Sequence, residues 1–70
     1  MNEKSINKLL EETQETAERL NKLNAFMATA DFPKLERTDK DLLYSQQRIM
    51  SKYVQVLGKR IERAGATLRI

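Results

Sequence analysis

Cysteine and histidine are both missing from this 70-residue sequence, and each absence excludes a class of site. Without cysteine there is no disulfide, no thiolate nucleophile and no cysteine-based metal site. Without histidine the commonest general base and the commonest metal ligand are lost. No Walker loop, Rossmann fingerprint or glycine-rich nucleophile elbow is present either. We therefore expect a protein that is not an enzyme and that holds no cofactor and no metal.

The chain is also short of long apolar runs. No segment approaches the roughly 18 apolar residues that a membrane helix requires, and the first residues lack the apolar core of a signal peptide. This pattern predicts an intracellular protein without a membrane partner. A chain of this length buries little surface alone. Because disulfides and metal sites are excluded, association of subunits is the remaining route to stability.

Glycine and proline are scarce, and their positions divide the chain. Residues 1–30 contain neither, and their apolar residues recur at helical spacing, which predicts a helix over about 4–30. Pro33 interrupts the pattern and predicts a loop over about 31–38. Thr38 is the expected cap of a second helix over about 39–64. The predicted fold is a single all-α domain over 1–70, an antiparallel two-helix hairpin.

Gly65 predicts the end of the second helix, followed by a short extended C-terminal tail. The second helix carries two apolar rows in which residues recur every seven positions. One row is Leu43, Met50, Leu57 and Ala64, and the other is Leu42, Ile49 and Val56. A single partner helix covers only one row. The second row, with Tyr53 beside it, predicts a homo-oligomeric helical bundle larger than a dimer.

Charge is distributed unevenly along the chain. Residues 1–35 carry a net charge of −1 and residues 36–70 a net charge of +4, which favours an anionic partner. Basic residues gather around Gly65, where backbone amides freed at a helix end and the Thr67 hydroxyl could also bind an anion. These basic residues are Lys59, Arg60, Arg63 and Arg69. The alternative is that they only solubilise a helix end and complement its dipole.

Two other groups of residues have simpler interpretations. Glu11, Glu12, Glu15 and Glu18 form an acidic run on the first helix. A solvated face paired with nearby basic residues explains this run better than a cation site. Tyr44 lies off the main rows and could stack on a base, although a partly exposed aromatic residue is an ordinary finding.

One ordered set of residues resembles the helical hairpin shared by phage anti-CBASS and anti-Thoeris nucleotide sponges. The resemblance covers about residues 8–63. It is carried by Leu20-Asn21-Lys22-Leu23-Asn24-Ala25-Phe26, Phe32, Leu35, Asp41-Leu42-Leu43, Gln46, Met50, Tyr53, Leu57 and Arg60-Ile61.

The resemblance implies an oligomer, with a hexamer as the family's frequent form, that sequesters cyclic nucleotide signals of bacterial immunity. The ligand classes it implies are cyclic dinucleotides, cyclic trinucleotides and cyclic ADP-ribose isomers. Trinucleotide pockets in this family lie where three hairpins meet. By resemblance, the contributing residues here are Arg60, Arg63, Ala64, Gly65, Thr67 and Arg69.

The chain departs from this family in two ways. Little precedes its first helix, which favours a cyclic trinucleotide over a dinucleotide, and it lacks the further domain of anti-Thoeris members. The expected function is a phage-encoded anti-defence sponge acting in the cytoplasm of the infected bacterial host. The alternative is a small phage protein-interaction module that inhibits a host defence protein through a helical face. A nucleic acid polymer is a weaker candidate, because a net charge of +3 comes without a basic recognition helix.

Overall fold

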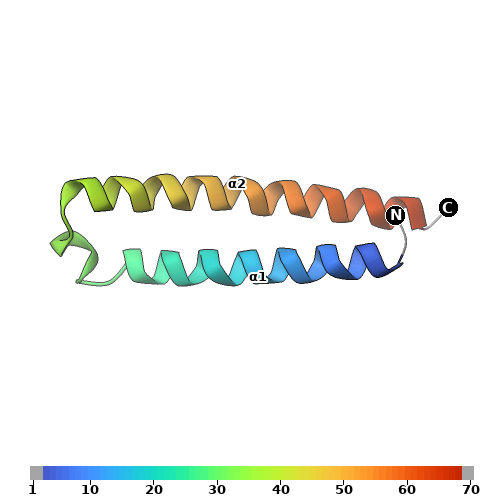
Figure 1. Cartoon of the computed structure of the whole chain (residues 1–70), viewed down its shortest axis with the longest axis horizontal. Helices are drawn as coiled ribbons and strands as arrows, with labels where there is room; N and C mark the ends of the chain where they lie inside the picture. Colours follow the sequence, from blue (N-terminus) through green and yellow to red (C-terminus); the bar gives the residue numbers. More distant parts are fainter. Residues whose placement is uncertain (1–2, 69–70) are drawn as a thin grey trace.

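The computed structural model describes residues 3–68, with side chains described for residues 4–65. Helix α1 spans Glu3–Met27, a short 3-10 helix η1 spans Phe32–Lys34, and helix α2 spans Arg37–Leu68. The two long helices lie side by side and antiparallel, with η1 at one end and both termini at the other (Figure 1). The molecule is a rod of 52 × 14 × 14 Å. The predicted all-α hairpin is confirmed.

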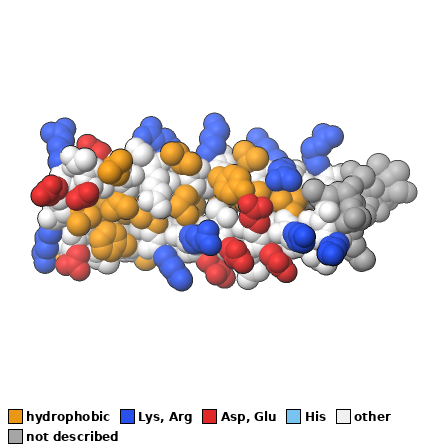
Figure 2. All heavy atoms as spheres, viewed as in Figure 1, with side chains coloured by type: hydrophobic (Ala, Val, Ile, Leu, Met, Phe, Trp, Pro, Cys, Tyr) orange, Lys and Arg blue, Asp and Glu red, His pale blue; other side chains and the backbone are white. Residues whose placement is uncertain are grey.

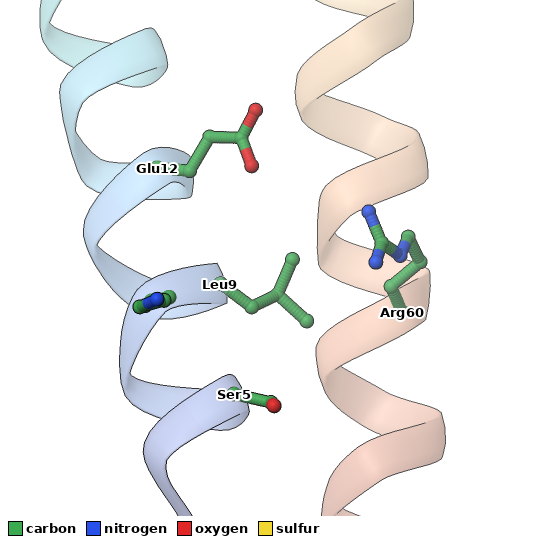
Figure 3. A pocket seen from close by; sticks show the side chains of 5 residues that line it. Ser5, Leu9, Glu12 and Arg60 are labelled. Atoms are coloured by element: carbon green, nitrogen blue, oxygen red, sulfur yellow. The ribbon is translucent and has the colours of Figure 1, made fainter. Parts of the chain in front are cut away.

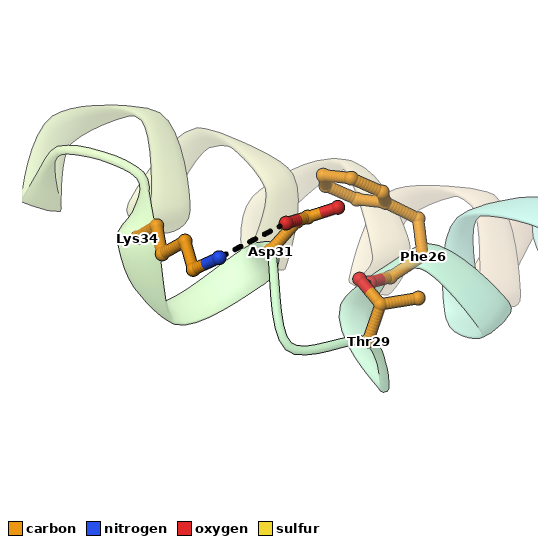
Figure 4. A network of polar contacts seen from close by, with 4 residues as sticks. All are labelled: Phe26, Thr29, Asp31 and Lys34. Carbon is orange, nitrogen blue, oxygen red and sulfur yellow. Dashed lines mark hydrogen bonds and ion pairs between the residues drawn. The ribbon is translucent and has the colours of Figure 1, made fainter.

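The break between the helices centres on Pro33, as predicted. Pro33 lies in η1, where its missing N–H requires no partner. Lys34 makes a 3.5 Å ion pair with Asp31 across this turn (Figure 4). Phe32 is buried and contacts Phe26 and Tyr44 edge to face, with ring centroids 6.3 and 5.4 Å away. These three rings pack together at the turn end of the hairpin, and Tyr44 covers Phe32 while remaining 52% exposed.

Helix α2 begins earlier than the sequence predicts. The Glu36 carbonyl accepts the hydrogen bond of the Lys40 N–H at 3.0 Å, so Glu36 occupies the N-cap position. The predicted Thr38 cap is wrong, because the backbone already leaves the extended conformation of Leu35 and enters the helix at Arg37. Helix α1 also ends at Met27, before the expected position near residue 30.

The predicted helix end at Gly65 is wrong as well. Helix α2 continues through Gly65 to Leu68, and neither glycine of the chain has a positive φ. Glycine lowers helix stability by about 1 kcal/mol relative to alanine but does not by itself terminate a helix. The extended tail that was expected from residue 66 is therefore helical at least as far as Leu68, and residues 69–70 lie outside the described part of the chain.

The core between the helices is narrow. Leu57 is fully buried, and Leu9, Phe32 and Ala64 are 4–6% exposed. Thr16 is also buried, and its hydroxyl donates to the Glu12 carbonyl at 2.7 Å, which satisfies the polar group inside the helix. On α1 the row that faces α2 therefore includes Leu9 and Thr16. Leu10, the neighbour of Leu9 along α1, is 45% exposed.

A second apolar row of α2 faces outward. Leu42, Ile49 and Val56 are 63%, 69% and 45% exposed, and we call these three residues the α2 apolar row. The buried row through Leu57 lies beside it and contacts α1. Apolar side chains are visible on the surface across both helices in Figure 2, among charged side chains. The two predicted rows are thus present, and the hairpin covers one of them.

Truncating the fully buried leucine tests the importance of this narrow core. We expect Leu57→Ala to lower the free energy of unfolding by about 2–5 kcal/mol, because it removes buried methyl groups and leaves a cavity. The exposed neighbour Gln55 offers a control, and Gln55→Ala should change stability by less than about 0.5 kcal/mol. Urea unfolding followed by circular dichroism measures both; similar midpoints for the two variants would contradict this account of the core.

Gly58 provides a second test of the packing. A Cβ atom added there meets nothing within 4 Å, so the close helix approach that could have explained this glycine is absent from the hairpin. We expect Gly58→Ala to stabilise the protein by up to about 1 kcal/mol, through helix propensity alone. Thermal unfolding measures the change. A lower melting temperature would instead show that another copy of the chain approaches the backbone at Gly58.

Candidate functional site at the open end of the hairpin

The predicted site residues lie on the last turns of α2, near the open end of the hairpin. Arg60 and Arg63 are exposed, Gly65 is half-buried and Ala64 is buried against α1. The backbone of Thr67 belongs to α2, but its side chain is not among those described, and Arg69 lies outside the described residues. The structure thus places two arginines on an accessible surface and assigns Ala64 to the core.

Helix α2 changes the chemistry expected at Gly65. The sequence suggested that backbone amides would become free there and bind an anion. Because the helix continues to Leu68, the amides around Gly65 lie within it, where N–H groups bond to the preceding turn. The expectation of free backbone donors at Gly65 is therefore wrong. Arginine and lysine side chains are the anion donors that this end of α2 provides.

Helix α1 contributes to the same end of the molecule. An open groove of about 280 Å³ is lined by Ser5, Lys8, Leu9 and Glu12 of α1 and by Arg60 of α2. The Glu12 and Arg60 side chains extend from opposite helices toward the space between them (Figure 3). The antiparallel pairing brings these residues together, because both lie far from the η1 turn. Two cations and one carboxylate thus line one groove.

Glu12 also joins the helices through Tyr53. The Tyr53 hydroxyl donates a hydrogen bond to the Glu12 carboxylate. This hydrogen bond raises the pKa of Tyr53 above its ordinary value of 10.0, with smaller contributions from desolvation and the Glu12 charge, whereas the positive charge of Arg60 lowers it. Tyr53 is therefore a protonated donor throughout the neutral range. A similar bridge from Gln47 to Asn24 lies nearer to the turn.

The groove has the chemistry of a site for an anion that also carries hydrogen-bond donors. Lys8 and Arg60 can donate to phosphate oxygens, and the Glu12 carboxylate can accept from an amine or an amide. The sequence analysis did not find Lys8, Glu12 or Tyr53 as site residues. The signal that could have found them is the distance of each from Pro33 along its helix, since residues about equally distant from the turn face one another.

Other classes of site are not apparent in the described structure. Among the described residues, no three acidic side chains come close enough to hold a metal ion. All four glutamates of the acidic run are exposed, and Glu11, Glu15 and Glu18 fit the expected solvated face, whereas Glu12 accepts a hydrogen bond from Tyr53 of α2. Neither of the two long helices, over the part that is described, is apolar enough along its length to cross a membrane.

A family model described as Sequestin matches residues 3–63, which includes both long helices, the η1 turn and the arginines at positions 60 and 63. No curated protein and no solved structure matches the chain.

The bridge between Glu12 and Tyr53 can be tested by titration. Tyr44 and Tyr53 are the two tyrosines and tryptophan is absent, so Tyr44→Phe leaves Tyr53 as the sole phenol in ultraviolet absorbance. In that background we expect Glu12→Ala to lower the pKa of Tyr53, because the hydrogen bond and the nearby charge are removed. Glu11→Ala is the matched control, since Glu11 is also an exposed glutamate of α1.

The sign of the linked stability effect follows from this pKa. The pKa of Tyr53 in the folded protein lies above the unfolded value of 10.0. The hydrogen bond to Glu12 therefore makes its full contribution to the free energy of unfolding below pH 10. Its contribution is lost as the pH rises through the raised pKa of Tyr53. Identical tyrosine titrations for the parent, Glu11→Ala and Glu12→Ala proteins would show that the bridge does not form in solution.

Proposed function

We propose that this chain, which belongs to the Sequestin family, binds a small anionic ligand to keep it from its receptor and performs no reaction on it. The family name indicates sequestering, which requires binding and not catalysis. The absence of histidine and cysteine from the sequence agrees with this role, because it removes the commonest catalytic groups.

The proposed ligand is a cyclic oligonucleotide, with a cyclic trinucleotide favoured over a dinucleotide and a cyclic ADP-ribose isomer as a further candidate. The observation that carries the proposal is the exposure of Arg60 and Arg63 at one end of α2, where Arg60 lines a groove together with Lys8 of α1. Guanidinium groups match phosphate oxygens in two-point hydrogen bonds. Gly65, the Thr67 hydroxyl and Arg69 belong to the same proposed site, whereas Ala64, which was predicted with them, is buried in the core.

Assembly would complete such a site. One hairpin offers few donors, and its groove is open to solvent. In a cyclic homo-oligomer, rotation repeats the same arginines around the axis, so that they meet the repeating phosphates of a symmetric ligand. A protein made in excess then lowers the free ligand concentration by mass action. The proposed setting is the cytoplasm of an infected bacterium, where the ligand is an immune signal and the protein is phage-encoded.

A second candidate function follows from the α2 apolar row. This exposed row could dock on a host defence protein, and the chain would then act as a protein-interaction module. Sedimentation of the purified protein separates the two functions. A homo-oligomer that covers the row favours the sponge, whereas a stable monomer favours the interaction module.

Isothermal titration calorimetry with a cyclic trinucleotide tests the proposed ligand site. We expect Arg63→Ala to weaken binding by more than tenfold, because each charge-assisted hydrogen bond contributes about 1.5–3 kcal/mol and every subunit loses its copy. Arg48→Ala is the matched control, since Arg48 is an exposed arginine of α2 that lies far from the groove in sequence. It should bind as the parent does.

Two results would contradict the proposal in different ways. Equal affinities for the parent and Arg63→Ala would move the site away from the end of α2. No heat with cyclic dinucleotides, cyclic trinucleotides or cyclic ADP-ribose isomers would favour the protein-interaction module. Circular dichroism and sedimentation of Arg63→Ala must match the parent, so that a loss of affinity reports the site and not the fold.

A further inference from the structure

We infer that two copies of this chain pair antiparallel through the outer face of α2, with a two-fold axis at Ile49. The first ground is the α2 apolar row itself. Its three side chains are 45–69% exposed, whereas the residues of the row that contacts α1 are all half-buried or buried. They repeat every seven residues, the spacing at which a helix contacts a neighbouring helix. The exposed row is therefore a second helix-packing surface, like the first.

Charge along this face selects a second copy of the chain as the partner. Successive residues of a helix are rotated by about 100° around its axis, which gives the angle between each charged residue and the row. Charged residues within roughly 80° of the row lie on the same face as the row, and the others lie on the opposite side of α2. Near the start of the row these residues are Asp39 and Asp41, past its middle Lys52, and near its end Lys59, Arg60 and Arg63. The basic residues near the start of the row and the acidic residue near its end lie on the other side of α2. These are Arg37, Lys40 and Glu62.

The outer face of α2 is thus acidic at its start and basic from Lys52 to its end, with the α2 apolar row running between the charged residues. Such a surface is complementary to itself when one copy is reversed. Leu42 of one copy then lies opposite Val56 of the other, and Ile49 lies opposite Ile49. Asp41 of one copy approaches Lys59 of the other, because both lie on the same flank of the row. A parallel pair would instead place like charges together at both ends, which is unfavourable.

The apolar and charged residues have different roles in this pairing. Apolar surface removed from water supplies the affinity, at about 25 cal/mol per Å². Exposed ion pairs add little affinity but discriminate between orientations. Because the same patch is used by both copies, the contact closes on itself as an isologous interface. This inference concerns the free protein and does not depend on the proposed ligand.

The absence of native cysteine allows a direct test by single-cysteine cross-linking. A disulfide requires Cα atoms within about 7 Å. We expect Ile49→Cys to form a disulfide dimer under mild oxidation, because this position lies on the two-fold axis. Leu42→Cys alone should not cross-link, since two copies of position 42 are separated by 14 helical residues, or about 21 Å along the axis. A mixture of Leu42→Cys and Val56→Cys should form a mixed dimer.

Arg48→Cys is the matched control for random collision, because it is exposed and adjacent to Ile49 but roughly 100° away around the helix. It should not cross-link. Self-linked dimers of Leu42→Cys and of Val56→Cys would overturn the antiparallel arrangement in favour of a parallel one. No disulfide from Ile49→Cys, together with a monomer in sedimentation, would overturn the pairing itself.

A charge exchange provides an independent test that leaves the apolar row intact. We expect Asp41→Lys and Lys59→Glu each to weaken the dimer by several-fold at low salt, and the double variant to recover the parent affinity. Sedimentation equilibrium without ligand measures all three. Failure of the double variant to recover would contradict the antiparallel register. Because no ligand is present, this outcome is distinct from the failure of nucleotide binding.

Discussion

The constraint on which the rest of this structure depends is that one helix can cover only one side of another. Helix α1 covers the row of α2 that contains Leu57, and this leucine is the one fully buried side chain among those described. Leu42, Ile49 and Val56 lie on the neighbouring row and remain exposed. A hairpin of two helices therefore has an incomplete core and retains a surface suited to a further helix. Stability and assembly follow from the same geometry.

The helical backbone of α2 determines what kind of site this scaffold can hold. Had the helix ended at Gly65, the backbone groups left without partners would have been carbonyls, which accept hydrogen bonds and do not bind anions. Since α2 continues to Leu68, its amides are bonded within the helix, and the donors are the side chains of Arg60 and Arg63, with Lys8 from α1 nearby. Long side chains on a helix surface lose conformational entropy when they bind. A site of this type gains affinity from several copies that act together more readily than from one hairpin.

Sequence reasoning succeeded where a periodic pattern or a proline dominated the local structure. The break at Pro33 and the two rows of α2 follow from single residues and seven-residue repeats, and both are present. The helix ends were less predictable, because Glu36, the N-cap residue of α2, is not a characteristic capping residue and Gly65 is accommodated within a helix. The Tyr53–Glu12 bridge was missed because it depends on the register between the helices, which spacing within one helix does not define.

The apolar row and the basic residues are linked by their positions on α2. Arg63 follows Val56 by seven residues, so it continues the line of Leu42, Ile49 and Val56 into the charged end of the helix. A copy of the chain that packs on this row must therefore bring part of its own surface close to Arg63. Any ligand that binds only the assembled form stabilises that form by mass action. Because such coupling is reciprocal, assembly must strengthen ligand binding by the same free energy. A short chain can thus obtain from association both the core and the binding site that one hairpin lacks.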